Sequence, residues 1–458
     1  MNTINPSTQE IITTLDADTV EQLQSKLAKL KQAQPPWYSK GIDYRLEILW
    51  KFYDLLEVHK AVLAEVLTSE VGKPTQQSIN EVNGGRGRIK WLCDNAKKYL
   101  ATDWMTEEEG IGEKIEYEPL GVVCNISAWN YPYLVGINVI VPALLAGNAV
   151  MYKPSEFATL TGLKIQSLLY EAGVPSDIFQ IAIGTKEVGA VLLEMNFDGY
   201  FFTGSYATGN FIYQQVAKKM VPCQLELGGK DPVYVADDVV DVANTAIGIA
   251  DGAFYNNGQS CCAVERIYVH EKIYDDFLNT FVAEMKSWKI GSPTEEGVYI
   301  GALTRKEQIT LLEQQVEDAK DKGADVLAGG KRIDRVGNFF EPTVLINVNN
   351  SMRVMREESF GPIIGIMKVK DDNEAIVLMN DTDYGLTAGV YSSSQVRAEN
   401  ILAQIQSGTG YWNCCDRVSA ALPWSGRKHS GFGATLSHAG IRAFTQPKAY
   451  HLRGAWSK

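Results

Sequence analysis

The feature that most constrains the fold of this chain is a regular alternation of short apolar runs with helix-length segments after residue 120. The strand-like runs cover residues 121–126, 149–153, 178–183, 200–203 and 231–235, and helices between them cover residues 133–146 and 159–172. Strands that alternate with helices of this length predict βαβ units and a parallel sheet. A second alternating set follows, with strands at 266–270, 361–369 and 388–391 and helices at 272–288, 304–323 and 372–380. We therefore expect two α/β halves, with a seam near residues 229–240.

The length and charge of the chain limit its class. With 458 residues it is too long for one ordinary core, so two or three domains are expected. Residues 19–105 are predicted to be helical, because apolar residues recur at spacings of three and four from Tyr44 to Val66. The net charge of −12 disfavours nucleic acid and anionic membrane surfaces as partners.

Several features favour a cytoplasmic protein. The first ten residues lack the basic stretch and apolar core of a secretory signal. The longest apolar run, 133–150, is interrupted by Asn138, Pro142 and Asn148, which favours a buried helix followed by a strand over a membrane span. The 7 cysteines show no regular spacing, which indicates free thiols. The 5 histidines are scattered, so no metal site is predicted.

Residues 254–263 contain a pair of cysteines after an Asn-Asn-Gly-Gln-Ser turn. A cysteine that follows such a turn is a candidate nucleophile, because backbone amides there can point at a reacting oxygen and a thiolate attacks carbonyls well. Taken alone, a cysteine pair such as Cys261 and Cys262 in an apolar segment more often fills a buried core than performs a reaction.

Residues 224–230 place Glu226 between two leucines and before a Gly-Gly pair. A carboxylate in an apolar setting has a raised pKa, which suits a general base. The alternative is an exposed glutamate at the end of a strand.

Three further segments carry polar residues at predicted strand ends. The side-chain amide of Asn130 is a candidate donor to an oxyanion. Lys153 and Glu156 are candidates for gripping the hydroxyls and phosphate of a nucleotide. Gly204 and Ser205 precede a helix whose free N–H groups favour a pyrophosphate, although this is not the usual G-x-G-x-x-G pattern.

In this order the segments resemble the motifs of the aldehyde dehydrogenase superfamily, and the resemblance extends from Asn5 to Gln446. Its most specific part is the co-occurrence of the ELGGK segment at 226–230 with the N-x-G-Q-x-C segment at 256–261. Further matches lie at residues 357–362, 380, 384–386, 412–413, 422–426 and 430–433. Two positions depart from the family pattern, Ala128 before Trp-Asn and Trp424-Ser425 in place of Phe-Gly, which puts the pocket shape in doubt.

The resemblance implies a mechanism and an NAD(P)⁺ cofactor. Cys261 would be the nucleophile, Asn130 and the Cys261 N–H would hold the oxyanion, and Glu226 would activate water to hydrolyse a thioester. The residues that match cofactor-binding positions are Trp129, Lys153, Glu156, Gly204, Ser205, Glu358 and Phe360. Because Glu156 would accept a hydrogen bond from the ribose 2′-OH, we expect NAD⁺ to be preferred, with NADP⁺ possible.

The resemblance also implies the domain organisation. Residues 1–104 and 120–228 would form a cofactor domain of modified Rossmann type, and residues 229–429 a catalytic α/β domain. Residues 105–119 and 430–458 would form a small β arm, with its C-terminal strand at 446–453, that pairs subunits into a homodimer or homotetramer.

The substrate class stays open between two hypotheses. Tyr131, Tyr255 and Trp412 suggest an aromatic-walled tunnel for uncharged aldehydes of medium size, which we favour. The minority hypothesis is a semialdehyde such as succinic semialdehyde, bound through the cation of Arg417, although Arg417 is equally able to pair with Asp416 or a partner subunit, or to face solvent.

Rival functions are each disfavoured by a residue. An acylating relative that transfers the thioester to coenzyme A, or a reductase of γ-glutamyl phosphate type, would commonly lack Glu226. A non-catalytic protein on the same scaffold would be expected to have lost Cys261, Glu226 or Asn130, and all three are present.

Overall fold

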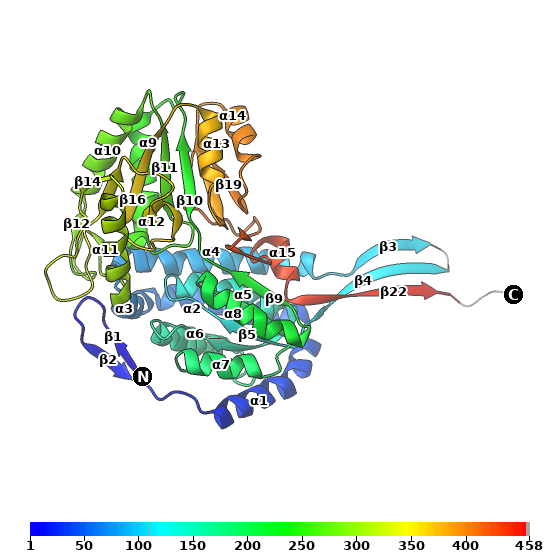
Figure 1. Ribbon diagram of the computed structural model, residues 1–458. Helices are drawn as coiled ribbons and strands as arrows, with labels where there is room; N and C mark the ends of the chain where they lie inside the picture. Colours follow the sequence, from blue (N-terminus) through cyan, green and yellow to red (C-terminus); the bar gives the residue numbers. More distant parts are fainter. Residues whose placement is uncertain (109, 455–458) are drawn as a thin grey trace.

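The computed structural model of the protein describes residues 1–108 and 110–454. Two open sheets, one above the other in Figure 1, form the body of the molecule. The lower sheet has the strand order β21-β9-β8-β5-β6-β7. Its strands are β5 (Val122–Ile126), β6 (Ala149–Lys153), β7 (Phe179–Ile181), β8 (Gly199–Thr203), β9 (Cys223–Glu226) and β21 (Gly431–Phe432). All neighbours are parallel except β21, which runs antiparallel to β9, so the predicted parallel sheet is confirmed.

Helices cover the lower sheet. The crossover helices are α5 (Pro132–Ala146), α6 (Thr159–Ala172), α7 (Lys186–Glu194) and α8 (Tyr206–Val216). The helices before the sheet are α1 (Val20–Ser39), α2 (Gly41–Val58), α3 (Lys60–Val71) and α4 (Thr75–Tyr99), which confirms the helical prediction except at its end, where a strand begins at Asp103. Because α5 is apolar all round, it lies almost wholly buried beside α4, as the sequence predicted.

The upper sheet has seven strands in the order β14-β15-β16-β11-β10-β18-β19. They are β10 (Asp231–Val235), β11 (Val264–His270), β14 (Asp325–Ala328), β15 (Thr343–Ile346), β16 (Ile363–Val369), β18 (Thr387–Tyr391) and β19 (Thr409–Trp412). Its helices are α9 (Val242–Phe254), α10 (Tyr274–Ser287), α11 (Lys306–Asp321), α12 (Arg353–Arg356), α13 (Asp372–Asn380) and α14 (Gln395–Leu402). Only β14 is antiparallel to its neighbour, so this half is a parallel sheet too.

The remaining elements are short. They are β1 (Asn2–Ile4), β2 (Ile11–Thr14), β12 (Lys289–Ile290), β13 (Val298–Ile300), β17 (Tyr384–Gly385), β20 (Arg427–Lys428), α15 (Ser437–Arg442) and the 3₁₀ turns η1 (Ala217–Lys219) and η2 (Tyr255–Gly258).

The chain passes from the lower sheet to the upper one between Glu226, where β9 ends, and Asp231, where β10 begins. This crossing lies at the seam predicted near residues 229–240. Lys230 is buried there and donates a hydrogen bond to Glu265 at 2.5 Å, which satisfies both charges.

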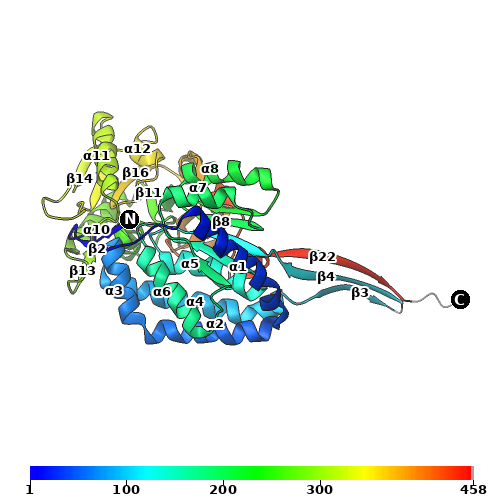
Figure 2. The same ribbon diagram turned by 90° about the horizontal axis from the view of Figure 1, so that it is seen from below.

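A three-stranded sheet leaves the body as an arm, seen in both ribbon views (Figures 1 and 2). It consists of β3 (Asp103–Glu108), β4 (Ile111–Pro119) and β22 (Thr445–Arg453), with β4 in the middle. Residues 430–444, which the sequence analysis placed in the arm, lie instead in the body, because β21 pairs with β9 and α15 packs against α4 and α5. Residues 455–458 of the predicted arm segment lie outside the described residues.

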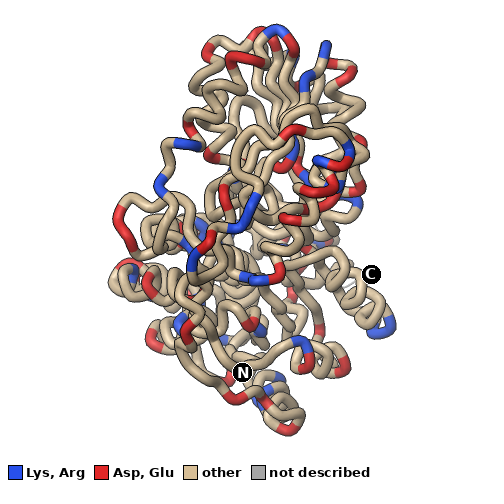
Figure 3. The backbone as a smooth tube through the Cα atoms, turned by 60° about the vertical axis from the view of Figure 1, so that its left-hand side comes forward, with Lys and Arg blue, Asp and Glu red and all other residues tan. Residues whose placement is uncertain are grey.

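Acidic and basic residues are interspersed through both halves of the body in the view of Figure 3. Among the described residues, no helix combines the length and the apolar character that crossing a membrane requires.

Candidate active site

A cavity of about 1640 Å³ collects the candidate site residues of the sequence analysis except Trp412. The expectation that Trp412 forms part of the aromatic wall is wrong, because it does not line the cavity and its indole N–H donates to the carbonyl of Ser392 at 2.9 Å. Its lining includes Trp129, Asn130, Tyr131, Lys153, Glu156, Gly204, Ser205, Glu226, Tyr255, Cys261, Glu358, Phe360 and Arg417. These residues come from both sheets and from the loops between them, so one continuous space connects the segments that the sequence singled out separately.

The segment before the cysteine pair is a buried left-handed turn. Asn256, Asn257 and Gly258 have φ values of 54°, 57° and 70°, a region that asparagine and glycine adopt most readily. A Cβ on Gly258 would lie 2.4 Å from the carbonyl oxygen of Gly361, so only glycine fits there. The amide groups of both asparagines donate to backbone carbonyls elsewhere in the chain. The Asn-Asn-Gly sequence therefore fixes the position of the cysteines that follow.

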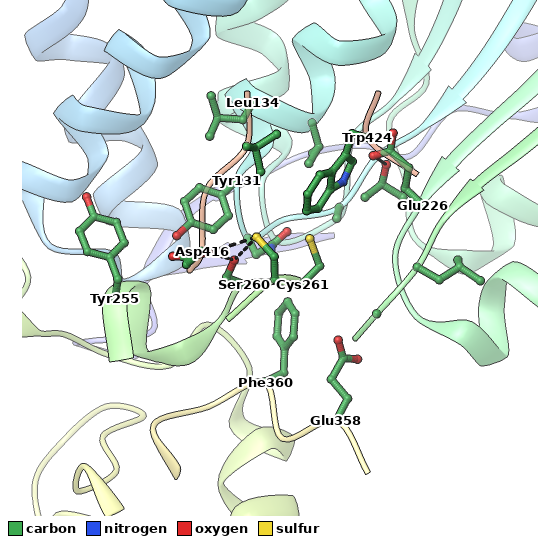
Figure 4. A pocket seen from close by; sticks show the side chains of 18 of the residues that line it. Tyr131, Leu134, Glu226, Tyr255, Ser260, Cys261, Glu358, Phe360, Asp416 and Trp424 are labelled. Carbon is green, nitrogen blue, oxygen red and sulfur yellow. Dashed lines mark hydrogen bonds between the residues drawn. The ribbon is translucent and has the colours of Figure 1, made fainter. Parts of the chain in front are cut away.

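The two adjacent thiols have different surroundings. Cys261 is half-buried and lines the cavity, whereas Cys262 is only 4% exposed. The Cys262 thiol donates to the carboxylate of Asp416 at 3.1 Å. The Ser260 hydroxyl donates to the same oxygen at 3.1 Å (Figure 4). The hydrogen bond with Cys261, together with burial, raises the pKa of Cys262 well above its usual value. Cys261 is thus the accessible thiol of the pair.

Glu226 is the last residue of β9 and is buried, so the alternative of an exposed strand-end glutamate is wrong. Its carboxylate accepts hydrogen bonds from the hydroxyls of Thr435 and, at 3.5 Å, Thr203. Burial raises the pKa of Glu226 to about 7, against the opposing effects of the Thr435 hydroxyl and the charge of Arg88. A carboxylate with this pKa both gains and loses a proton near neutral pH, as a general base must.

Asn130 lies in the loop between β5 and α5, and its neighbours hold it in place. Its side-chain amide donates to the carbonyl of Gln259 at 3.1 Å, and its backbone carbonyl accepts a hydrogen bond from Lys73 at 2.8 Å. Lys73 forms an ion pair with Glu81, and both side chains are fully buried. The Lys73 ammonium also lies 3.8 Å from the centre of the Tyr131 ring. This arrangement fixes the loop that carries Asn130 against the turn before Cys261.

The part of the cavity lining around Lys153, Gly204 and Ser205, called the far end below, has the groups expected for a dinucleotide. Lys153 ends β6, is 4% exposed, and donates to the carbonyl of Pro154 at 3.2 Å. No carboxylate lies within 4.0 Å of its ammonium in the part of the chain that the structure describes, so donors remain for a ligand. Gly204 has no room for a side chain, because a Cβ would lie 2.5 Å from the Phe202 ring. Ser205 caps the N-terminus of α8 by accepting a hydrogen bond from the Thr208 N–H at 3.4 Å.

Glu358 and Phe360 reach this space from the upper sheet. The backbone N–H of Gly229 donates to Glu358 at 3.0 Å, and a Cβ on Gly228 would lie 2.3 Å from the same carboxylate. Glu358 thus packs directly on Gly228, whereas a Cβ on Gly229 would lie 2.6 Å from the backbone carbonyl oxygen of Cys261. Burial and the charge of Glu265 raise the pKa of Glu358 to about 8. Phe360 has a φ of 47° and packs edge-on against Trp129 at 5.4 Å.

The near end of the cavity is lined by aromatic residues. In the view of Figure 4, Tyr131 and Tyr255 lie to one side of Cys261, Trp424 and Glu226 lie above it, and Phe360 and Glu358 lie below it. The Tyr255 hydroxyl accepts a hydrogen bond from Asn80 at 3.0 Å.

Arg417 is exposed, and no ion pair within 4.0 Å involves it among residues 1–108 and 110–454. Arg417 therefore does not pair with Asp416 of the same chain. The Asp416 carboxylate accepts hydrogen bonds from Ser260 and Cys262 instead.

Three residues around the cavity were missed by the sequence analysis. Asp416 precedes Arg417 in the loop that the sequence analysis had already examined, so its position in the sequence could have indicated a role at the site. Arg88 lies on the face of α4 that also carries Glu81 and Gly84, at the spacing of a helical face, which was a weaker signal. Nothing local marks Thr435, because only the folding of the C-terminal segment brings it to Glu226.

These observations define a class of protein: an α/β enzyme with two mostly parallel sheets, in which a positioned thiol and a buried carboxylate line one cavity. The profile of the Aldehyde dehydrogenase family matches residues 1–450. The chain belongs to this family, whose members oxidise aldehydes to acids with NAD(P)⁺.

Individual relatives agree over the whole length. The chain is 35% identical to betaine aldehyde dehydrogenase of Hordeum vulgare over 457 residues, covering 97% of this chain and 90% of that protein. It is 35% identical to a putative succinate-semialdehyde dehydrogenase [NADP(+)] of Mycolicibacterium smegmatis over 447 residues, covering 95% and 85%. An NAD-dependent aldehyde dehydrogenase from Sinorhizobium meliloti has a similar structure, with a TM-score of 0.96 and 29% identity over 100% of this chain and 92% of the other. The fold expected from the sequence is therefore confirmed.

Proposed function

We propose that this protein oxidises its aldehyde through a thioester on Cys261. The main support for this proposal is that three groups line one cavity: the accessible thiol of Cys261, the buried carboxylate of Glu226 with a pKa of about 7, and the side-chain amide of Asn130. Cys261 reacts as the thiolate, after its proton has passed to solvent: its sulfur bonds to the aldehyde carbonyl carbon, and the carbonyl oxygen takes the electron pair of the C=O π bond. Asn130 and the Cys261 N–H donate hydrogen bonds to that oxyanion. NAD(P)⁺, when bound, supplies the acceptor for the hydride that leaves this carbon.

Glu226 acts after the thioester has formed. Its carboxylate takes a proton from water, the water oxygen bonds to the acyl carbon, and the Cys261 sulfur leaves with the electron pair of the C–S bond. Because burial raises the pKa of Glu226 to about 7, a substantial fraction is ionised at neutral pH and still binds protons strongly enough to deprotonate water.

The residues at the far end of the cavity fit a nicotinamide dinucleotide. Lys153 and Glu156 would hold the adenosine ribose, and Gly204, Ser205 and the N-terminus of α8 would face the pyrophosphate. Trp129, Glu358 and Phe360 would contact the remainder of the cofactor. Glu156 supports a preference for NAD⁺ over NADP⁺, because a 2′-phosphate would meet a like charge.

Two further features of the protein are proposals. The projecting arm of β3, β4 and β22 offers strand edges outside the body, which supports its role in pairing subunits into a homodimer or homotetramer. A cytoplasmic location stays a prediction from the free thiols and the sequence.

The test of the mechanism is an assay of NADH formation with and without coenzyme A, followed by mass spectrometry of the protein during turnover. We expect turnover without coenzyme A and an acyl group on Cys261. Strict dependence on coenzyme A would favour the acylating alternative, and an acyl group elsewhere would remove Cys261 from the mechanism.

A further inference from the structure

Arg88 is a buried cation on the wall of the cavity with most of its hydrogen-bonding capacity unused. It is 9% exposed and lies on α4. A guanidinium carries five N–H donors, and one nitrogen of Arg88 donates to the side-chain oxygen of Asn138 at 2.9 Å. Within residues 1–108 and 110–454 the Arg88 guanidinium forms no other hydrogen bond or ion pair. Its remaining nitrogens are nevertheless not fully buried. The free donors therefore reach the open space of the cavity.

The carboxylates near Arg88 are already engaged. Glu81 forms its ion pair with Lys73 and also accepts a hydrogen bond from the Tyr133 N–H at 2.9 Å. Glu226 is bonded by the Thr435 and Thr203 hydroxyls and is partly protonated near neutral pH. A buried cation without a full counter-charge is unfavourable, so this position suits an anion that enters from the cavity.

Arg88 also lies within electrostatic range of the reacting groups. Burial lowers the pKa of Arg88, and the negative charge of Glu226 opposes this effect. Arg88 and Cys261 line the same cavity, so an anion held by Arg88 and a carbonyl at Cys261 would share one continuous space. Space is available, because the neighbouring Gly87 lines the cavity and a Cβ there would meet no atom within 4 Å.

We propose that Arg88, oriented by Asn138, binds a carboxylate of the substrate, so that this protein oxidises short aldehydes that carry a carboxylate at the far end. The planar fork of arginine matches a carboxylate with two parallel hydrogen bonds. This inference rests on the proposed function and names its substrate class. In this version of the semialdehyde hypothesis the carboxylate is bound by buried Arg88 and not by exposed Arg417. The aromatic residues of the cavity would contact the carbon chain of the substrate.

The test compares two aldehydes with the same carbon chain, succinic semialdehyde and butanal. We expect the wild-type protein to prefer the semialdehyde in kcat/KM by about 30-fold or more, and Arg88→Gln to remove most of this preference. The loss should lie mainly in KM, because an anchor distant from the reacting carbon binds substrate and transition state alike. Arg88→Lys, which keeps the charge and loses the fork, should give an intermediate value. Arg417→Gln, the matched variant in the same cavity, should change the preference by less than about threefold.

A second readout does not depend on turnover. Succinate should slow the alkylation of Cys261 by iodoacetamide in the wild-type protein and not in Arg88→Gln. If both aldehydes lose kcat/KM equally, and iodoacetamide alone also reacts more slowly with Arg88→Gln, then Arg88 serves the thiol and the inference is overturned. The inference is also overturned if Arg417→Gln shifts the preference between the two aldehydes. If Arg88→Gln does not fold, an unchanged preference in Arg88→Lys overturns the inference. Absence of turnover with both aldehydes contradicts the proposed function, whereas succinate protection still reports on the anchor.

Discussion

The hydroxyl of Thr435 donates a hydrogen bond to the carboxylate of Glu226, which lies 209 residues earlier in the chain. Both residues are buried, and the contact joins the segment before α15 to the end of β9. A hydrogen bond to the ionised carboxylate favours that form and lowers its pKa, whereas burial raises it. The proton affinity of the proposed base is thus set by two parts of the chain that are distant in sequence.

Replacing Thr435 with valine should move the pH dependence of hydrolysis. Without the donor, the pKa of Glu226 rises further above its usual value. Activity that needs the ionised carboxylate is present above this pKa and is lost as the pH falls through it. The acidic limb of kcat, expected near pH 7 in the wild-type protein, should therefore move to higher pH by about one unit. Thr435→Ser keeps the hydroxyl and should leave the limb in place; a limb that stays fixed in both variants would separate Thr435 from the base.

Glu226→Gln should stop the reaction at the thioester. Hydride loss precedes hydrolysis, so we expect a rapid burst of NADH followed by a steady state slower by about 10²–10⁴-fold. Stopped-flow absorbance measures both phases. An unchanged steady-state rate would show that another group activates the water.

The two adjacent cysteines should behave differently. Cys261→Ala should abolish turnover and acylation, because it removes the accessible thiol, whereas Cys262→Ala should retain much of the activity. Cys262 is buried and bonded to Asp416, so its loss should appear mainly as a lower melting temperature. Steady-state rates and thermal unfolding of both variants provide the check, and equal loss of activity in the two would contradict the assignment.

Cofactor preference should depend on Glu156. We expect a lower KM for NAD⁺ than for NADP⁺, and Glu156→Gln should narrow the difference, because it removes the negative charge facing a 2′-phosphate. The neighbouring Lys153 keeps a cation available for that phosphate. Initial rates with both cofactors measure the effect. A lower KM for NADP⁺ at equal kcat in the wild-type protein would refute the preference.

Lys73→Met should destabilise the protein, since it leaves the Glu81 carboxylate buried without its partner. Breaking one side of a buried ion pair costs about 3–5 kcal/mol in the free energy of unfolding. The double variant Lys73→Met with Glu81→Leu removes both charges and should recover part of the loss. Denaturant unfolding of the three proteins tests this, and a stable single variant would show that Glu81 is protonated in the folded state.

The sequence by itself determined the elements and the chemistry of their ends. Apolar runs such as 149–153 and 200–203 predicted strands correctly, because short apolar segments between helices have few other ways to be buried. The glycine and asparagine residues before Cys261 predicted a turn, since these residue types enter left-handed conformations at low cost. The sequence analysis did not assign β9, which is only four residues long, or α9.

Only the tertiary structure decided which side chains meet. The burial of Glu226, the ion pair of Lys73 with Glu81 beneath Asn130 and the open guanidinium of Arg88 all depend on contacts between helices, loops and sheets far apart in the chain. The boundary of the arm was also misplaced, because the pairing of β21 with β9 depends on a partner two hundred residues away. The physical reason is that pattern and propensity act over a few neighbouring residues, whereas desolvation, charge pairing and proton affinity depend on what the whole fold brings within a few ångströms.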